Sequence, residues 1–274
     1  MQIHIVESDY VETVNNIELR DIIIKKLEKI EKENDVKILY AVESGSRGWG
    51  FESPDSDYDV RFIYIHKPDW YLSIQSRKDV IELPINDLLD INGWDIRKTL
   101  VLFSKSNPTL LEWLTSPIIY KQSGNFIETL KTLQEEYFRS ASCVYHYLHM
   151  AEGNYREYLK GDLVKVKKYF YVLRPIMACI WIEKYKTQPP MLFETLLNSV
   201  ITDPVLLKEI NILLKRKRKS REMDEEQKID VINEFLEEKI LYFNEYVKQL
   251  DSDINKNVEH LDRLFRETLQ EVWS

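Results

Sequence analysis

Apolar positions repeat with two different periods along this chain, and the change of period divides it into two parts. Over residues 14–34 they recur every three to four positions between charged residues, which predicts a helix with one apolar face. Residues 36–42 form a short, mostly apolar run, as a buried strand does, and residues 58–65 alternate apolar with polar side chains, as a half-buried strand does. Weaker strand patterns cover residues 79–83 and 87–94.

From residue 96 onward, helical spacing replaces the alternation. The predicted helices, which are separated by prolines, glycines and polar residues, cover residues 96–106, 108–114, 124–139, 141–159, 163–186, 191–199, 204–218, 225–249 and 253–272. The pattern therefore predicts an α+β protein, with a small mixed β-sheet domain over residues 1–117 and an all-helical domain over residues 118–274. The last two helices are amphipathic, and we expect them to form core contacts or contacts between copies of the chain.

The composition narrows the class of protein. Of the 274 residues, 44% are hydrophobic, which is enough for a core and excludes a disordered chain. The two cysteines, Cys143 and Cys179, provide neither a disulfide framework nor a four-cysteine metal site, so we expect a reducing, cytoplasmic location. The N-terminus lacks the pattern of a signal peptide, and the most apolar run, residues 169–182, is interrupted by Arg174 and Pro175. We therefore expect no membrane association.

The net charge of −8 argues against a protein that coats nucleic acid through bulk positive charge, so any phosphate chemistry must depend on a local site. Three of the seven glycines lie within residues 45–50, directly after the first predicted strand. Glycine allows backbone amides to approach a phosphate closely. In this turn Gly45 and Ser46 suit a triphosphate, and Arg47 adds a positive charge. A lone turn of this kind is more often structural, because tight turns require glycine for steric reasons.

Two carboxylates follow at the start of the second predicted strand. Asp57 and Asp59 are two residues apart, so in a strand their side chains point the same way. Like charges at this separation repel each other, and a divalent cation relieves the repulsion. Hard oxygen ligands of this kind suit Mg²⁺ or Mn²⁺. Taken alone, such a pair is more often an acidic turn before an exposed strand.

The combination is more specific than either part. Gly45-Ser46, ten intervening residues, and Asp57-x-Asp59 on an alternating strand resemble the signature of the DNA polymerase β nucleotidyltransferase superfamily. One branch, the predicted nucleotidyltransferases associated with bacterial and phage RNA-repair loci, is more similar still. The segments that carry this closer resemblance are GSRGWGF (45–51), SPDSDYDVRF (53–62), LDINGWD (89–95) and KSNPTLLEWL (105–114). The likeness covers about residues 39–117 and is weaker in the helical part.

The resemblance implies a nucleotidyltransferase core that transfers an NMP from an NTP to an acceptor hydroxyl and releases pyrophosphate. It also implies that Asp57, Asp59 and a third carboxylate hold two ions of Mg²⁺ or Mn²⁺ as cofactors. We expect the third carboxylate to be Asp90, because the superfamily keeps it on a later strand. Asp95 and Glu82 are alternatives, and Asp95 equally suits the cap of the helix predicted from residue 96.

Members of the superfamily often place a lysine of the helical domain on the phosphates and an aromatic ring against the base. In the helix predicted over residues 163–186, Lys167, Tyr171 and Arg174 share a face that would meet a nucleotide across a cleft. A solvated basic face over a core stripe is the alternative interpretation. The nucleotide-binding residues that the resemblance implies are Gly45, Ser46, Arg47, Lys168 and Tyr171.

The sequence gives weaker evidence for the molecule that accepts the nucleotide. Residues 215–221 contain six basic residues in seven, a density that suits an RNA backbone, although a helix end rich in cations is an equal interpretation. We expect RNA as the acceptor. The alternatives are a protein acceptor and a nucleotide- or RNA-end-binding module that has lost catalysis. Retention of both acids, Ser46 and the glycines favours an active enzyme.

Overall fold

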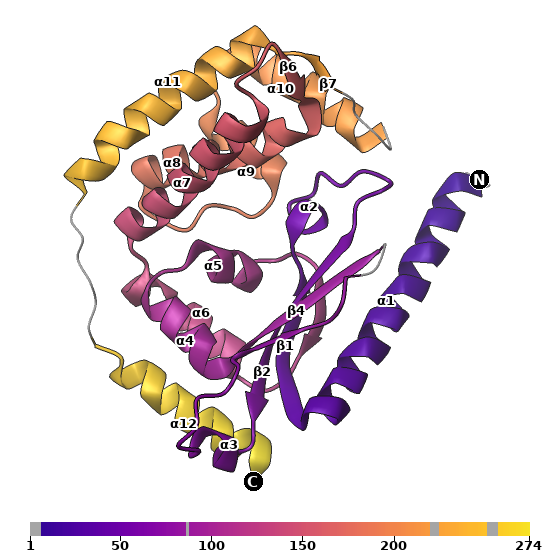
Figure 1. Ribbon diagram of the computed structural model, residues 1–274, viewed down its shortest axis with the longest axis vertical. Coiled ribbons are helices and arrows are strands. Elements are labelled where there is room, and N and C mark those ends of the chain that lie inside the picture. Colours follow the sequence, from indigo (N-terminus) through magenta and orange to yellow (C-terminus); the bar gives the residue numbers. More distant parts are fainter. Residues whose placement is uncertain (1–6, 86–87, 220–224, 251–256) are drawn as a thin grey trace, which may run out of the picture.

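The structure is a computed structural model that describes residues 7–85, 88–219, 225–250 and 257–274. Its first part alternates helices with the strands of one sheet (Figure 1). In chain order these elements are α1 (Glu7–Asn34), β1 (Val36–Glu43), α2 (Gly45–Gly48), β2 (Tyr58–His66), α3 (Pro68–Tyr71), β3 (Val80–Glu82), β4 (Leu89–Asp95), α4 (Ile96–Ser104), α5 (Pro108–Leu114), β5 (Ile119–Gln122) and α6 (Phe126–Tyr137). The strands predicted from alternation and apolar runs are confirmed as β1, β2, β3 and β4.

The remaining elements are mostly helical. They are α7 (Ser140–Tyr158), β6 (Leu163–Lys165), the 3-10 helix η1 (Val166–Lys168), α8 (Tyr169–Tyr185), α9 (Phe193–Val200), α10 (Pro204–Lys219), β7 (Glu225–Gln227), α11 (Asp230–Tyr246), the 3-10 helix η2 (Val247–Gln249) and α12 (Glu259–Trp273). The predicted α+β class, with a sheet first and helices after it, is confirmed. In the described part of the chain, none of the helices combines the length and the apolar character that crossing a membrane requires.

The main sheet has the strand order β3-β4-β2-β1-β5. β2 and β4 run parallel, and the other neighbours are antiparallel. β5 pairs with β1, although the sequence pattern predicts no strand after residue 95. This edge strand has four residues, none of them fully buried, so it lacks the alternation that would reveal it. The sheet therefore continues past residue 117.

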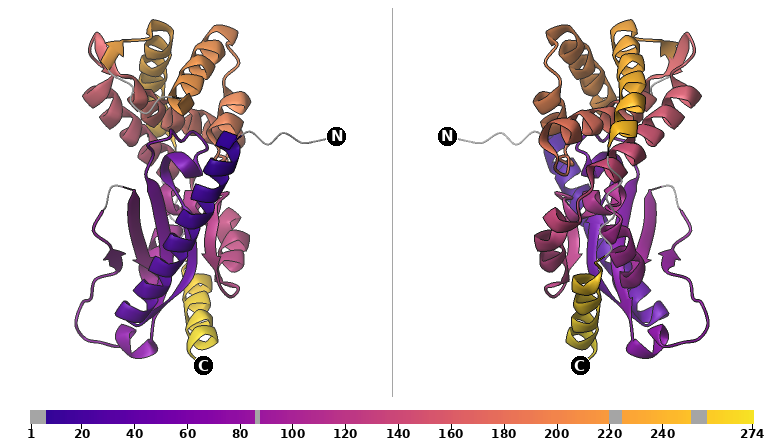
Figure 2. Two further views of the ribbon diagram at one scale, coloured as in Figure 1. Left: turned by 90° about the vertical axis from the view of Figure 1, so that its right-hand side faces the viewer. Right: turned by 90° about the vertical axis from the view of Figure 1, so that its left-hand side faces the viewer.

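The two faces of the sheet are covered differently. α1 lies across one face (Figure 2), where its Ile23, Leu27 and Ile30 pack with Val60 and Phe62 of β2. Ile63 and Ile65 of β2 belong instead to the larger core on the opposite face. Because side chains alternate along a strand, Asp59 and Arg61 lie on this second face, which α4, α5 and the helical part cover.

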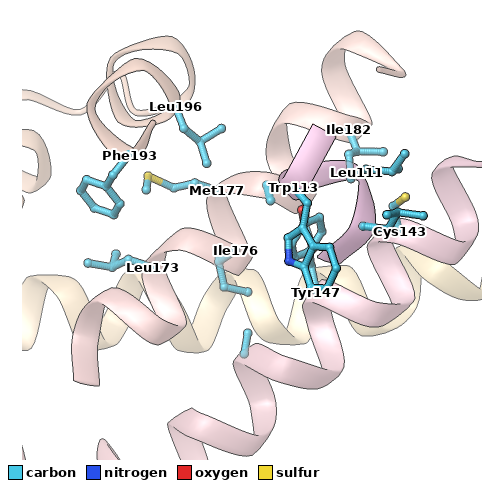
Figure 3. Close-up of a cluster of buried hydrophobic side chains, with 14 of the residues drawn as sticks. Leu111, Trp113, Cys143, Tyr147, Leu173, Ile176, Met177, Ile182, Phe193 and Leu196 are labelled. Carbon is cyan, nitrogen blue, oxygen red and sulfur yellow. The ribbon is translucent and has the colours of Figure 1, made fainter. Parts of the chain in front are cut away.

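The helical part and the sheet domain share one core. Figure 3 shows the buried side chains that meet there: Leu111 and Trp113 of α5, Cys143 and Tyr147 of α7, Leu173, Ile176, Met177 and Ile182 of α8, and Phe193 and Leu196 of α9. α5 comes from the first part of the chain, so the boundary between the two parts is a packed interior. At the other end of the molecule, α12 returns to the sheet domain beside α3 and α4 (Figure 1), and the ring of Phe265 packs against Tyr71 with 4.9 Å between centroids.

Two predicted helices begin with a strand instead. The helices expected over residues 163–186 and 225–249 start with β6 and β7, which pair antiparallel with each other, so the C-terminal part is not all-helical. Helix α8 begins at Tyr169 and α11 at Asp230. The pairing joins segments about 60 residues apart, and both strands lie in stretches whose apolar residues follow helical spacing, so the sequence pattern does not separate them from the helices.

Candidate active site

The turn after β1 is built for a close approach of chain segments. Gly45 opens the four-residue helix α2 with a φ of 54°, in the left-handed region that glycine adopts without strain. A Cβ atom at this position would lie 1.9 Å from Oδ2 of Asp59. Gly48 is equally confined, because a Cβ there would lie 2.8 Å from the carbonyl oxygen of Glu43. The glycines therefore let the backbone of the turn lie directly against the carboxylate of Asp59.

Asp59 and Asp90 lie side by side on neighbouring strands. They are register partners in the parallel pair of β2 and β4, and both face the core side of the sheet. Nη2 of Arg61 donates to Oδ1 of Asp59 at 2.8 Å and to Oδ2 of Asp90 at 2.7 Å. Burial raises the pKa of Asp59 and the charges of Asp90 and Asp57 add to this, whereas Arg61 opposes it. Arg61 thus supplies the positive charge between two carboxylates.

Asp57 lies in the loop just before β2 and is exposed. Its backbone is held by Arg47, whose guanidinium donates to the carbonyl oxygens of Asp57 at 3.2 Å and Ser56 at 2.9 Å. The same guanidinium lies 3.9 Å from the ring centre of Tyr58. Arg47 therefore positions the loop that carries Asp57, and its predicted contact with a nucleotide stays a prediction.

A pocket of about 170 Å³ joins these groups to the helical part. It is lined by Ser46, Ser53, Asp55, Ser56, Asp57, Asp59, Lys167, Tyr171 and Lys217. Four of the predicted site residues therefore meet at one place: Ser46, Asp57, Asp59 and Tyr171. The carboxylates and hydroxyls form one wall, and the lysines and the tyrosine form the other.

Lys217 is a site residue that the sequence pattern did not single out from the basic run. It is 3% exposed, on the face of α10 that also buries Leu206, Ile210, Leu213 and Leu214. Its ammonium lies 5.1 Å from the ring centre of Phe51, and no carboxylate in the described residues is within ion-pair distance. Burial, together with the positive charge of Lys167, lowers its pKa to about 8. A lysine at apolar-face spacing is the signal in the sequence that distinguishes it from its exposed neighbours.

The two arginines of the run that the structure describes have partners. Arg216 pairs with Glu226, and Arg218 pairs with Glu194 at 2.7 Å and donates to the carbonyl oxygen of Gly50. Residues 220 and 221 lie outside the described residues. The described part of the run therefore consists of two arginines in surface ion pairs, two exposed lysines (Lys215 and Lys219) and one buried lysine in the pocket.

The predicted lysine and tyrosine of the helical part occupy different places. Tyr171 lines the pocket, whereas the ammonium of Lys168 lies beside it, 4.9 Å from the Tyr171 ring centre. Lys167 lines the pocket and pairs with Asp55 at 2.9 Å. Arg174, expected on the same face, is instead buried against Glu112 at 2.6 Å and does not line the pocket.

Glu43 is a second residue that the sequence pattern did not indicate. It is fully buried at the end of β1, where it accepts a hydrogen bond from the backbone N–H of Asp59 at 2.8 Å and another from the hydroxyl of Tyr120. Burial raises its pKa to about 7, against the opposing effect of these hydrogen bonds. Glu43 therefore fixes the position of the Asp59 backbone through this hydrogen bond. A charged residue that ends an apolar strand is the only signal for it in the sequence.

The alternatives for the third carboxylate lie elsewhere. Asp95 caps α4, where its side chain accepts from the N–H of Arg97 at 2.8 Å and the hydroxyl of Tyr71 at 2.7 Å. It is five residues along β4 from Asp90, or roughly 16 Å. Glu82 lies on the outer strand β3 and accepts from the side chain of Asn92 at 2.8 Å. Of the three candidates, Asp90 is the one beside Asp59.

Two of the three predicted carboxylates are placed to bind a hard divalent cation together. Asp57 and Asp59 offer carboxylate oxygens to one pocket, which are the ligands that Mg²⁺ and Mn²⁺ prefer. Asp90 has one oxygen held by Arg61. Across the described ranges, no three acidic, histidine or cysteine side chains converge as a preformed metal site.

Comparison with known proteins places the chain in a family. The model of the RNA repair pathway DNA polymerase beta family, RlaP, matches residues 19–267. The chain belongs to this family. The match spans both the sheet and the helical part, so it includes the pocket residues of both parts of the chain.

Two individual proteins are similar to this RlaP member. YcgL of Bacillus subtilis (strain 168), described as an uncharacterized protein, is 53% identical over 251 residues, which is 92% of this chain and 96% of YcgL. The solved structure of a nucleotidyltransferase-like protein from Exiguobacterium sibiricum 255-15 is 11% identical. The match covers 92% of this chain and 81% of that one with a TM-score of 0.31, which is too low to compare their sites.

Proposed function

We propose that this RlaP protein is a divalent-metal-dependent nucleotidyltransferase that transfers an NMP from an NTP to a hydroxyl group of RNA. The observation that carries the proposal is the pocket in which Asp57 and Asp59 face the buried ammonium of Lys217, which has no ion-pair partner among the residues that the structure describes. Carboxylates opposite such a cation suit a ligand that carries both a bound metal and negative phosphates.

Each side chain has a role in this reaction. The oxygen of the attacking hydroxyl forms a bond to the α-phosphorus of the NTP, its proton passes to solvent water, and the bond from the α-phosphorus to pyrophosphate breaks. Ser46 and the amides of α2 donate to phosphate oxygens, and Lys217 neutralises the charge that collects on the leaving pyrophosphate. Asp57 and Asp59 would hold Mg²⁺ or Mn²⁺, which supplies charge neutralisation at the phosphates and favours ionisation of the hydroxyl. Tyr171 offers a ring to the base.

Two residues position Asp59 for this role. Glu43 holds its backbone N–H, and Arg61 holds its Oδ1 together with Asp90. Both contacts fix the carboxylate before substrate binds, which lowers the cost of ordering it during the reaction. We propose Asp90 as the third acid, because it is the register partner of Asp59.

The experiment that tests the proposed function is transfer from each of the four labelled NTPs, with Mg²⁺ or Mn²⁺ and total cellular RNA. We expect label in RNA for at least one NTP, and none when the metal is chelated. Label in protein alone would assign a protein acceptor. NTP binding that requires metal, with no label in any macromolecule, would assign a binding module and contradict a transferase.

Lys217→Met is expected to raise the KM for the NTP about 10- to 100-fold with a smaller effect on kcat, because it removes a charge-assisted contact to phosphate. Methionine suits the apolar face of α10, so the fold should persist. In the wild type, kcat/KM should fall above pH about 8 as the ammonium of Lys217 loses its proton, and the variant should lack this fall. Steady-state kinetics at several pH values measure both effects. Lys208→Met, at an exposed position of the same helix, is the control. An unchanged KM in Lys217→Met would remove Lys217 from the site.

A further inference from the structure

Tyrosines and lysines alternate along the surface that leads away from the pocket. The tyrosine–lysine row consists of Tyr171, Lys168, Tyr158 and Lys165. Nζ of Lys168 lies 4.9 Å from the ring centre of Tyr171 and 4.5 Å from that of Tyr158. Nζ of Lys165 lies 5.8 Å from the Tyr158 ring centre. The row therefore starts at the pocket wall and connects the end of α7 with η1 and β6.

The far end of the row opens into a second hollow of about 440 Å³. Its lining includes three basic side chains, Arg156, Lys160 and Lys165, together with Tyr158 and two acidic residues, Glu157 and Glu225. Within the described ranges, no carboxylate pairs with any of the three basic groups or with Lys168. The whole chain has a net charge of −8, so it is rich in acidic residues. The excess of basic over acidic side chains at this hollow is therefore a property of the hollow and does not follow from the overall charge.

Folding alone does not account for this arrangement. Arg156, Lys160 and Lys165 are exposed, and cation–π contacts of exposed lysines contribute little to stability. The same groups match the requirements of a single nucleic-acid strand, whose unpaired bases stack on aromatic rings while its phosphates follow a basic groove. A base that stacks on Tyr158 would displace the ammonium of Lys168 or Lys165 toward the adjacent phosphate. A duplex keeps its bases stacked internally and cannot use the rings.

We infer that the tyrosine–lysine row and the hollow beyond it bind the single-stranded end of the acceptor RNA and direct its terminal hydroxyl to the pocket. The inference rests on the proposed function for the destination of that hydroxyl. The binding itself requires neither NTP nor metal, so it can be measured separately from transfer. The contacts assigned to phosphates are those of Arg156, Lys160 and Lys165, and the stacking contact is that of Tyr158.

The test is fluorescence anisotropy of a labelled 12-nucleotide single-stranded RNA with the full chain, without NTP or divalent metal, over a range of salt concentrations. Tyr158→Ala is expected to weaken binding about 5- to 100-fold, the range for loss of one stacked base. The double variant Lys160→Gln and Lys165→Gln is expected to weaken binding and to reduce the salt slope by about 0.7 for each lysine. The matched control is Tyr185→Ala with Lys184→Gln. This tyrosine and lysine are exposed at the far end of α8, and Nζ of Lys184 lies 4.8 Å from the ring centre of Tyr185.

The outcomes separate this inference from the proposed function. Wild-type RNA affinity in both Tyr158→Ala and the double lysine variant would contradict RNA binding by the tyrosine–lysine row, even if transfer to RNA is observed. Equal affinity for a 12-base-pair duplex would also overturn it, because bulk charge would then explain the binding. Loss of RNA binding in the variants of the row, combined with no NMP transfer by the wild type, would support RNA binding by the row and contradict the proposed transferase activity.

Discussion

Asp57→Asn is expected to lower the rate of NMP transfer at least about 1000-fold while the protein remains folded. Loss of one charged metal ligand removes several kcal/mol of transition-state stabilisation, and each 1.36 kcal/mol is a factor of ten in rate. Asp57 is the clean position for this test, because it is exposed and its side chain makes no hydrogen bond or ion pair within the described residues. Asp59 is less suitable, since its carboxylate also holds Arg61.

The measurement is transfer of labelled NMP, together with Mn²⁺ binding followed by calorimetry and a thermal melt of each protein. We expect weaker Mn²⁺ binding in the presence of NTP and an unchanged melt for Asp57→Asn. Glu82→Gln is the control, because Glu82 lies on the outer strand beside Asn92 and should leave transfer at the wild-type rate. A rate for Asp57→Asn within tenfold of the wild type would refute the role of this carboxylate.

Glu112→Ala is expected to lower the free energy of unfolding by about 3–5 kcal/mol, the cost of leaving a buried charge without its partner. Glu112 is 6% exposed and accepts hydrogen bonds from three side chains of other elements. The donors are Arg174 at 2.6 Å, Tyr147 at 2.7 Å and the indole N–H of Trp49 at 3.1 Å. These contacts join α5, α7, α8 and the end of the glycine turn, so the variant also loosens the attachment of the sheet domain to the helical part.

Urea denaturation monitored by tryptophan fluorescence measures the effect. The control is Glu194→Ala, which removes the exposed pair with Arg218 and should cost no more than about 1 kcal/mol. The double variant Glu112→Leu with Arg174→Met should recover part of the loss, because it replaces the buried charges with apolar groups of similar size. A change below 1 kcal/mol for Glu112→Ala would show that the buried pair does not stabilise the fold.

Much of the fold could be predicted because its signals are local. Alternation placed β2, the apolar run placed β1, and helical spacing placed most helices within a few residues. The helix cap at Asp95, one of two interpretations of that residue, is confirmed by its hydrogen bond to the N–H of Arg97. β5, β6 and β7 could not be predicted, since β5 has no fully buried residue to reveal an alternation and β6 and β7 lie in stretches with helical spacing.

The sequence by itself determined the turn, the carboxylate pair and the family. Gly45, Ser46, Asp57 and Asp59 are close in the chain: Gly45 and Ser46 lie in the turn after β1, Asp57 lies in the loop before β2, and Asp59 lies on β2. The family model bears out the resemblance that these residues carry. The roles of the individual residues stay predictions, because a motif names groups without showing what they contact.

Only the tertiary structure decided which distant groups face the carboxylate pair. The register of β2 and β4 puts Asp90 beside Asp59 and leaves Asp95 at the opposite end of the strand. Helix packing directs Lys217 into the pocket and commits Arg174 to Glu112. These choices depend on contacts between residues tens of positions or more apart, whose energies are set by burial and charge in the assembled fold. Helical spacing marks Lys217 as lying on an apolar face, but it does not show which other residues that face meets.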